Sequence, residues 1–414
     1  MLPVNDRFLL MYEKGGRLRT NKLADWRLPR SGREIFMIYL DHAATTPTAS
    51  EARLAMEPYY NRRYGNASTP YEFGQKSREA VEAARCTIAD TLHVQPKEIY
   101  FTSGGTESDN WALKSTMEAY SGAGRHMITT KIEHHAIGNT CEYLKKRGFE
   151  VTELAVDRDG RISLEQLERA IRPDTVLISI MCANNEIGTI QDMRAIGGIA
   201  KRKGVLFHTD AVQAYGQIPI DVAGWNVDML SASSHKFYGP KGCGFLYMKQ
   251  GLRTASMIHG GGQESGRRAG TENVPGIVGM AKAAELSFQR MEETASREQH
   301  LRDRMIYHIC TEIPGAYLVG SLTHRLPGNL NICFQGIEAS NLVLLLDEEG
   351  ICVSAGSACN SASPEPSHVL KAVGLSDAQA YSCIRMTLGR DTTVAELQYT
   401  LATLKRLVKI LKKG

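Results

Sequence analysis

Residues 229–247, MLSASSHKFYGPKGCGFLY, place a polar turn between two short apolar segments. The apolar segments, 229–232 and 244–247, have the length and composition of buried strands. Strands that are apolar on both faces are typical of a sheet covered by helices on both sides. The stretch therefore predicts two neighbouring strands of an α/β protein, with the polar turn at one edge of the sheet.

The preceding sequence repeats this pattern. Three more apolar segments predict buried strands, at 126–130, 176–181 and 205–209. Amphipathic segments between several of the strands predict helices, at 140–147, 163–171 and 193–203. Alternating strands and helices of this kind predict a parallel or mixed sheet with helices on both faces.

The pattern changes near residue 285. A long charged helix begins at about 285–313, and shorter strands follow at 330–334 and 351–353. An amphipathic helix at 394–413 ends the chain. We expect a large domain over 37–290, whose first residues can pack with the next domain, and a smaller α+β domain over 291–414. Residues 1–36 are expected to be a flexible extension or an untranslated segment.

Composition narrows the class of protein. The chain has 414 residues and a net charge of +4, and residues 1–36 carry all of that charge with eight Lys/Arg and four Asp/Glu. A neutral remainder argues against direct nucleic-acid binding, and the sequence has no apolar run long enough to span a membrane. The nine Cys are scattered without a C-x-x-C pair, and the segment before Met37 lacks a secretory pattern. These features predict a cytoplasmic protein without a metal site.

Lys236 follows the predicted strand 229–232, with hydroxyl side chains and His235 before it and Gly239-Pro240 after it. Burial and neighbouring positive charge lower the pKa of such an amine, so that it can attack an aldehyde. Ser233 and His235 are candidates to bind a phosphate. A solvated Lys in a turn is the common alternative for an isolated residue.

Asp210 ends the predicted strand 205–209. The pyridinium nitrogen of pyridoxal phosphate (PLP) requires such a carboxylate to remain protonated, and Gln213 lies three residues on, where a helix would bring it to the same face. An Asp that caps the N-terminus of a helix is the alternative.

Two further segments are candidates for cofactor binding. Residues 102–110, TSGGTESDN, form a Gly-containing loop that opens a helix, and backbone N–H groups there can hold a phosphate. A capping box that uses Thr106 or Ser103 is compatible with the same residues. His134, just after the strand 126–130, can stack on a ring or transfer a proton. No third ligand lies at metal spacing from His134 and His135.

Cys359 lies in a stretch of small and polar residues, VSAGSACNSAS at 353–363, with Pro364 and Pro366 after it. This composition predicts a loop, in which a cysteine is accessible and its thiolate can act as a nucleophile. A loop cysteine without a role is the alternative.

Seven motifs in order along the chain resemble those of the NifS/IscS-type cysteine desulfurases, which belong to the class-V aminotransferases and have PLP fold type I. The resemblance covers residues 37–410. The motifs are YLDHAATTP at 39–47, TSGGTESDN at 102–110, NNEIG at 184–188, HTDAVQ at 208–213, SHKFYGPKG at 234–242, HGGG at 259–262 and GSAC at 356–359.

The resemblance implies a role for each site residue. It implies that Lys236 binds PLP covalently, that Asp210 pairs with the ring nitrogen and Gln213 with the ring oxygen, and that His134 stacks on the ring. Phosphate ligands would be Gly105, Thr106, Ser233 and His235, with Thr271 from the partner subunit of a homodimer. Asn185 and Arg385 would bind the carboxylate of L-cysteine, and Cys359 would accept the sulfur as a persulfide.

The expected function is conversion of L-cysteine to L-alanine, with sulfur transfer to an acceptor. The acceptor is an iron–sulfur scaffold or a tRNA-thiolation protein, and the sequence does not distinguish between them. A selenocysteine lyase or another PLP enzyme of this fold is the alternative, and Cys359 favours the desulfurase because the other reactions need no thiolate.

Overall fold

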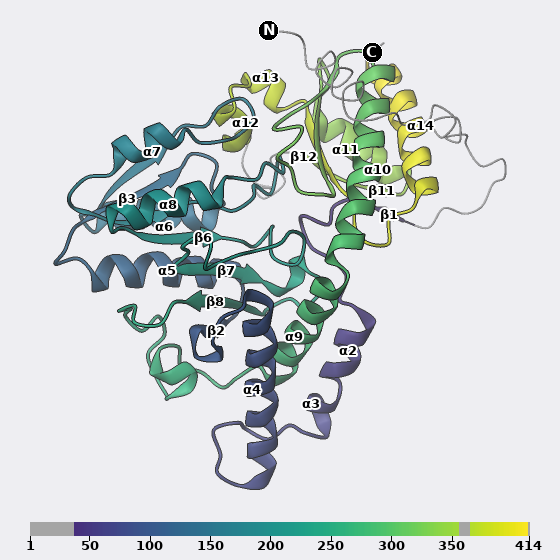
Figure 1. The fold of residues 1–414 in the computed structure, drawn as a ribbon. Helices are drawn as coiled ribbons and strands as arrows, with labels where there is room; N and C mark the ends of the chain where they lie inside the picture. The colour runs from purple at the N-terminus through teal and green to yellow at the C-terminus, as the bar shows by residue number, and fades with distance from the viewer. Residues whose placement is uncertain (1–36, 356–364, 413–414) are drawn as a thin grey trace.

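The computed structural model describes residues 37–355 and 365–412. Its largest sheet has seven strands in the order β2-β8-β7-β6-β5-β3-β4 (Figure 1). β8 runs antiparallel to both of its neighbours, whereas the other neighbouring strands are parallel. The predicted α/β class with a mainly parallel mixed sheet is therefore confirmed. The strands are β2 (Ile99–Thr102), β3 (His126–Thr130), β4 (Glu150–Leu154), β5 (Thr175–Ser179), β6 (Leu206–Asp210), β7 (Met229–Ser233) and β8 (Gly244–Met248).

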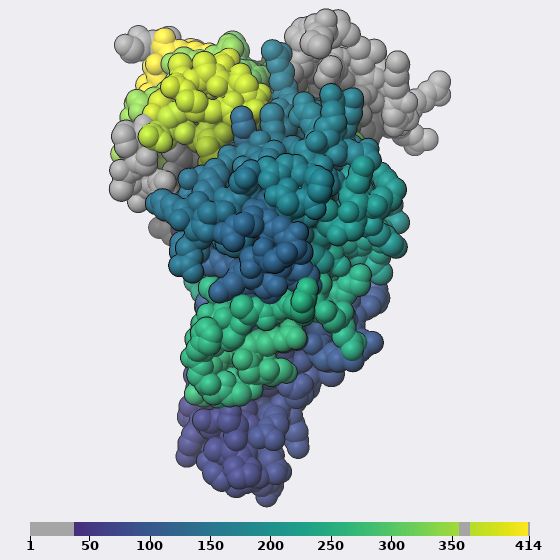
Figure 2. Space-filling model, turned by 90° about the vertical axis from the view of Figure 1, so that its left-hand side faces the viewer, coloured from purple at the N-terminus to yellow at the C-terminus, as the bar shows by residue number. Residues whose placement is uncertain are grey.

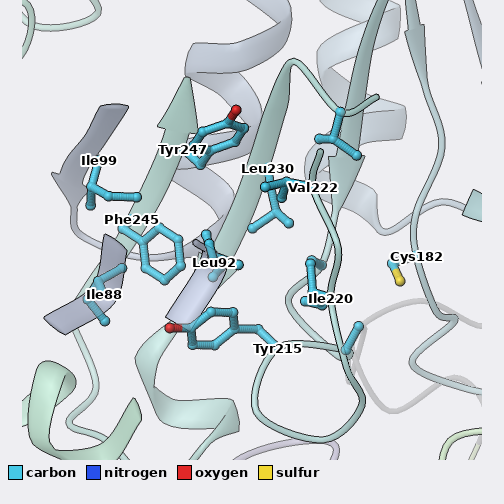
Figure 3. Packing of buried hydrophobic residues seen from close by; sticks show 14 of the residues in the cluster. Ile88, Leu92, Ile99, Cys182, Tyr215, Ile220, Val222, Leu230, Phe245 and Tyr247 are labelled. Carbon is cyan, nitrogen blue, oxygen red and sulfur yellow. The ribbon is translucent and has the colours of Figure 1, made fainter. Parts of the chain in front are cut away.

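Successive side chains of each central strand point to opposite faces of this sheet. In β7, Leu230 belongs to a core cluster that includes residues of α4, α8 and α9, whereas Met229 belongs to a second cluster with residues of α5 and α6. Figure 3 shows Leu230 and Phe245 on the first face, near Tyr215. Helices on both faces explain why the strands are apolar throughout. The helices of this part are α2 (Ser50–Met56), α3 (Pro58–Asn61), α4 (Glu72–Leu92), α5 (Gly105–Ala119), α6 (His135–Lys146), α7 (Leu164–Ala170), α8 (Met193–Lys203) and α9 (Val274–Gln289), with short 3-10 turns at Pro96–Glu98, Ser234–Lys236 and Gln263–Gly266.

A second, antiparallel sheet lies beside α10, α11 and α14 in Figure 1 and has the strand order β12-β13-β10-β9. A separate pair joins the beginning of the described chain to this region, because β1 (Ile38–Tyr39) runs parallel to β11 (Ile351–Cys352). In Figure 2 the early helices, in purple, form the lower end of the molecule and the yellow C-terminal residues the upper end. The remaining elements are β9 (Ala316–Leu318), β10 (Asn329–Phe334), β12 (Ser354–Ala355), β13 (Cys383–Thr387), α10 (Met291–Glu312), α11 (Ala339–Glu348), α12 (His368–Ala372), α13 (Asp377–Ala380) and α14 (Val394–Leu411).

The long charged helix expected at about 285–313 is present as α10, but it begins later, at Met291, because residues 285–289 belong to the end of α9. Arg290, with φ −111° and ψ 6°, ends α9 and caps α10. α9 packs its apolar face into the core of the large sheet, whereas Leu301 and Met305 of α10 belong to the core of the second sheet. One straight helix cannot serve both cores, so the chain turns at Arg290. The domain division at 290/291 stays a prediction.

The large sheet brings the ends of its strands to one edge. β2 and β7 point the same way because each is antiparallel to β8, and β7, β6, β5 and β3 are parallel. Asp210 is the last residue of β6, and the segments that hold Gly105, Lys236, Asn185 and His134 follow the carboxyl ends of the other four strands. This edge is where ligands bind in open α/β sheets. Over the described ranges, no helix has the length and apolar content needed to cross a bilayer.

Candidate active site

Lys236 ends the 3-10 turn that follows β7. Its Nζ donates hydrogen bonds to the main-chain oxygens of Ala43, at 2.6 Å, and Ala44, at 2.8 Å. These two carbonyls belong to the segment after β1, which the sheet order alone would not bring to Lys236. The amine is therefore held in place by main-chain acceptors close to the carboxyl edge of the sheet.

Asp210 is the last residue of β6 and is 5% exposed. Its Oδ1 accepts a hydrogen bond from Val212 N at 2.8 Å. Burial raises the pKa of this carboxyl, and the positive charge of Lys236 opposes that rise. The capping interaction expected as the alternative is present, but the segment that it caps is a series of turns and not a helix.

Gln213 reaches the site from those turns. The helix expected after Asp210 is limited to hydrogen-bonded turns, in which Ala214 N and Tyr215 N both donate to Ala211 O. Gln213 Nε2 donates to Ala43 O at 3.0 Å, the oxygen that also accepts from Lys236.

His134 caps the N-terminus of α6. Its Nδ1 accepts a hydrogen bond from Ala136 N at 3.1 Å, so the ring proton lies on Nε2. Burial, then the charge of Lys236, lowers the pKa of His134 to about 4. The ring is therefore neutral at physiological pH.

The start of α5 lies beside Ser233 and Val212. The N-cap is Gly104, with φ +150° and without a side-chain cap, so the capping box at Thr106 or Ser103 is not formed. A Cβ on Gly105 would lie 2.6 Å from Val212 Cγ2, so this position accepts only glycine without rearrangement. An uncapped helix start with a close backbone approach is suited to hold an anion.

His235 lies between Ser234 and Lys236 and is about half-buried. Its Nδ1 is 3.1 Å from Thr45 Oγ1. Burial, followed by the charges of Lys236 and Lys241, lowers the pKa of His235 to about 4. The neutral ring therefore carries a single N–H donor, in the same 3-10 turn as Lys236.

Arg385 lies in β13 of the second sheet and is 5% exposed. Its Nη2 donates to Asp41 Oδ1 at 2.8 Å and its Nη1 to the main-chain oxygen of Asn185 at 3.1 Å. The structure thus brings the two predicted carboxylate-binding residues together, although Asn185 contributes its main chain to this contact.

Thr271 lies in a different place. It is exposed and lines a cavity of about 190 Å³ together with Phe101, Ser103 and Arg268. Arg268 forms an ion pair with Glu107 of α5 at 2.8 Å, which ties the segment of Thr271 to the start of that helix. Cys359 lies outside the described residues.

A buried ion pair holds the same segment from the other side. Arg85 of α4 donates two hydrogen bonds of 2.8 Å to the carboxylate of Glu264, and Glu264 Oε2 also accepts from Phe101 N at 2.9 Å. Both residues of the pair are at most 9% exposed. The 262–272 segment is thus anchored to α4, β2 and α5.

The sequence did not reveal several groups that contact the predicted residues. The carbonyls of Ala43 and Ala44 bind Lys236, and Asp41 binds Arg385. All three lie in the motif at 39–47, for which only a resemblance was available. Main-chain acceptors have no sequence signal, but a carboxylate at Asp41 among small and apolar residues was a signal that could have been used.

A second unforeseen group lies beneath Asp210. His208 is fully buried, with Nδ1 at 2.9 Å from Ser179 Oγ and Nε2 at 3.0 Å from Ser231 Oγ. Burial, then the charge of Asp210, raises the pKa of the neighbouring Asp109 well above its usual range. A neutral Asp109 leaves Asp210 as the charged carboxylate of this pair.

Comparisons with known proteins agree with this geometry. Residues 38–400 match the class-V aminotransferase family model. The cysteine desulfurase IscS of Methanosarcina thermophila is 50% identical over 375 residues, which cover 91% of this chain and 93% of the relative. The corresponding protein of Dictyoglomus turgidum is 48% identical, covering 91% of this chain and 95% of its own.

Solved structures are also similar to this chain. A NifS-like protein superposes with a TM-score of 0.86 at 39% identity, covering 91% of this chain and 100% of its own. SspA in complex with cysteine superposes with a TM-score of 0.76 at 38% identity, covering 86% and 100%.

Proposed function

Because the chain belongs to the class-V aminotransferase family and is a PLP-dependent cysteine desulfurase, we propose how its own residues divide the work of that reaction. The observation that carries the proposal is the position of Lys236. Its charge lowers the pKa of His134 and opposes the rise at Asp210, so these side chains share one electrostatic environment.

The residues present fit PLP. A phosphate suits the uncapped start of α5 at Gly105 and Thr106, with Ser233 and His235 beside it. The buried carboxylate of Asp210 suits a protonated ring nitrogen, and Lys236 supplies the amine that binds the aldehyde. When bound, PLP supplies an electron-withdrawing ring for the charge that develops at the substrate Cα.

The protein groups then position the substrate and move its protons. Arg385 and Asn185 hold the carboxylate of L-cysteine, since a guanidinium matches a carboxylate in charge and shape. The amine of the substrate would displace that of Lys236, and the freed Lys236 amine would then remove the proton from Cα. His134 would stack on the ring of the bound cofactor and keep it oriented, and Gln213 would donate to the ring oxygen.

Cys359 accepts the sulfur of the substrate; this residue lies outside the described residues. The Cys359 thiolate attacks the substrate sulfur, the substrate C–S bond breaks, and a persulfide forms on Cys359. The carbon product is released as L-alanine after protonation. A sulfur-acceptor protein, either an iron–sulfur scaffold or a tRNA-thiolation protein, then takes the outer sulfur in the cytoplasm.

The proposal includes a homodimer. Thr271 is exposed and lies beside its own cavity, so we propose that it completes the phosphate site of a partner subunit. Sedimentation of the cofactor-loaded enzyme is expected to give a dimer. Thr271→Ala is expected to weaken PLP retention without changing the mass of the assembly.

The decisive experiment separates the cofactor from the sulfur chemistry. Cys359→Ala is expected to keep the PLP absorbance but to lose sulfide release from L-cysteine in the presence of a reductant. Lys236→Ala is expected to lose the covalently bound cofactor. Full sulfide release by Cys359→Ala would refute the role of Cys359, and labelled persulfide transferred from the wild type identifies the acceptor.

A further inference from the structure

Arg385 is already paired with a carboxylate of this chain. Asp41 Oδ1 lies 2.8 Å from Arg385 Nη2, and the Asn185 main-chain oxygen lies 3.1 Å from Nη1. Arg385 Nε is buried and has no hydrogen-bond partner among the described residues. An unpaired guanidinium at 5% exposure would be costly, so Asp41 neutralises a charge that the fold has buried.

Asp41 is itself fixed from a second direction. Its Oδ2 accepts a hydrogen bond from Ser354 Oγ at 2.7 Å. Ser354 lies opposite Arg385 in the pairing of β12 with β13, and the main chain at Asp41 forms a bridge with Thr387. Asp41 is therefore built into the second sheet and is not a mobile surface counter-ion.

The pairing has a consequence for a ligand that carries a carboxylate. Arg385 can bind the ligand carboxylate with two N–H groups only if the hydrogen bond between Asp41 and Nη2 breaks. If that hydrogen bond remains, two carboxylates share one guanidinium. We propose that Asp41 is a positioning residue that orients Arg385 and, by competing for Nη2, sets the affinity of the enzyme for the substrate carboxylate. The proposal rests on the role assigned to Arg385 above.

Asp41→Asn tests this directly. The amide keeps an acceptor for Arg385 and a partner for Ser354 but removes the competing negative charge. The Kd of L-alanine, measured by the change in PLP absorbance, is expected to fall by about threefold or more, because like charges close together in a buried site repel. The KM for L-cysteine is expected to fall with it, whereas ethylamine and cysteamine, which lack the carboxylate, bind unchanged.

Asp391→Asn is the matched control. Asp391 is exposed and pairs with Arg390 at 3.4 Å, so the same change in charge leaves Arg385 untouched. This variant is expected to bind L-alanine like the wild type. An Asp41→Asn protein that keeps PLP and its Tm but binds L-alanine no tighter than the wild type would overturn the proposal, as would an equal effect on ethylamine.

Ser354→Ala gives a second test of opposite sign, which also serves if Asp41→Asn does not fold. Without the Ser354 hydroxyl, the Asp41 carboxylate depends more on Arg385 and competes more strongly. The Kd of L-alanine is expected to rise by about tenfold, the lower end of the contribution of one hydrogen bond to a charged group, and an unchanged or lower Kd overturns the proposal. Arg385→Lys tests the premise separately, because equal loss for L-alanine and ethylamine would refute Arg385 as the carboxylate site, whatever Asp41 does.

Discussion

Arg85→Met removes the guanidinium that pairs with Glu264 and retains much of the apolar stem. In the wild type, three hydrogen bonds of 2.8 to 2.9 Å end on the Glu264 carboxylate, two from Arg85 and one from Phe101 N. In the variant only the hydrogen bond from Phe101 N remains, although Glu264 is only 9% exposed. We therefore expect a large loss of stability when this one buried ion pair is removed.

The magnitude follows from this burial. Removing one partner of a buried ion pair typically destabilises a protein by about 3–5 kcal/mol, a substantial part of the ~5–15 kcal/mol that holds a domain folded. The loss of the Arg85 contact with the Phe101 ring, 4.6 Å from the guanidinium, adds about 0.5–1 kcal/mol.

Urea unfolding followed by Trp fluorescence measures the effect, since Trp111 and Trp225 both lie in the part of the molecule that holds the large sheet. Glu82→Gln is the matched control. Glu82 also pairs with Arg85, at 3.3 Å, but its side chain is 56% exposed, so its loss is expected to cost less than about 1 kcal/mol.

The single variant Glu264→Gln and the double variant Arg85→Met/Glu264→Gln complete the cycle. The double variant leaves no buried charge, so most of the lost stability is expected to return, and the two substitutions are expected to be strongly non-additive. A loss in Arg85→Met no larger than that in Glu82→Gln, or additive effects in the double variant, would refute the reasoning.

Two other predictions concern helix packing and buried charge. Gly197→Ala in α8 would place a Cβ 1.6 Å from the Trp225 carbonyl oxygen and should lower the free energy of unfolding by about 1–3 kcal/mol. In the adjacent Gly198→Ala, the new Cβ meets only Arg202 Nη1, at 3.7 Å, and the substitution should raise the free energy of unfolding by about 0.5–1 kcal/mol. Equal effects of the two substitutions in urea unfolding would contradict this account. Burial raises the pKa of Glu298 to about 8, so the wild type loses stability as pH rises from about 4.5 to about 8, because only the unfolded chain ionises there. Glu298→Gln should therefore gain stability relative to the wild type, by at most about 1.4 kcal/mol per pH unit, and parallel pH curves would exclude the effect.

Much of the local structure was available from the sequence. The strand at 126–130 and the helix at 193–203 have the bounds expected from their apolar pattern, and the other predicted elements of the large sheet shift by a few residues at their ends. The helix expected at 140–147 begins earlier, at His135, because the His134 ring provides a cap that an apolar pattern does not indicate. The long helix expected at about 285–313 begins at Met291 instead, because composition does not show that residues 285–289 still belong to a helix that faces a different core.

The sequence by itself determined five of the seven strands of the large sheet, the polar residues at the carboxyl ends of these strands, and the motifs that identify the family. These features are local, since a buried strand is recorded in its own run of apolar residues and a motif in its own residues. Only the tertiary structure decided that Ala43 and Ala44 hold Lys236, that Asp41 occupies Arg385, and that Arg85 anchors Glu264. Those contacts join residues as many as 344 positions apart, and main-chain acceptors or paired charges at such separations depend on how the two sheets pack, which no local pattern encodes.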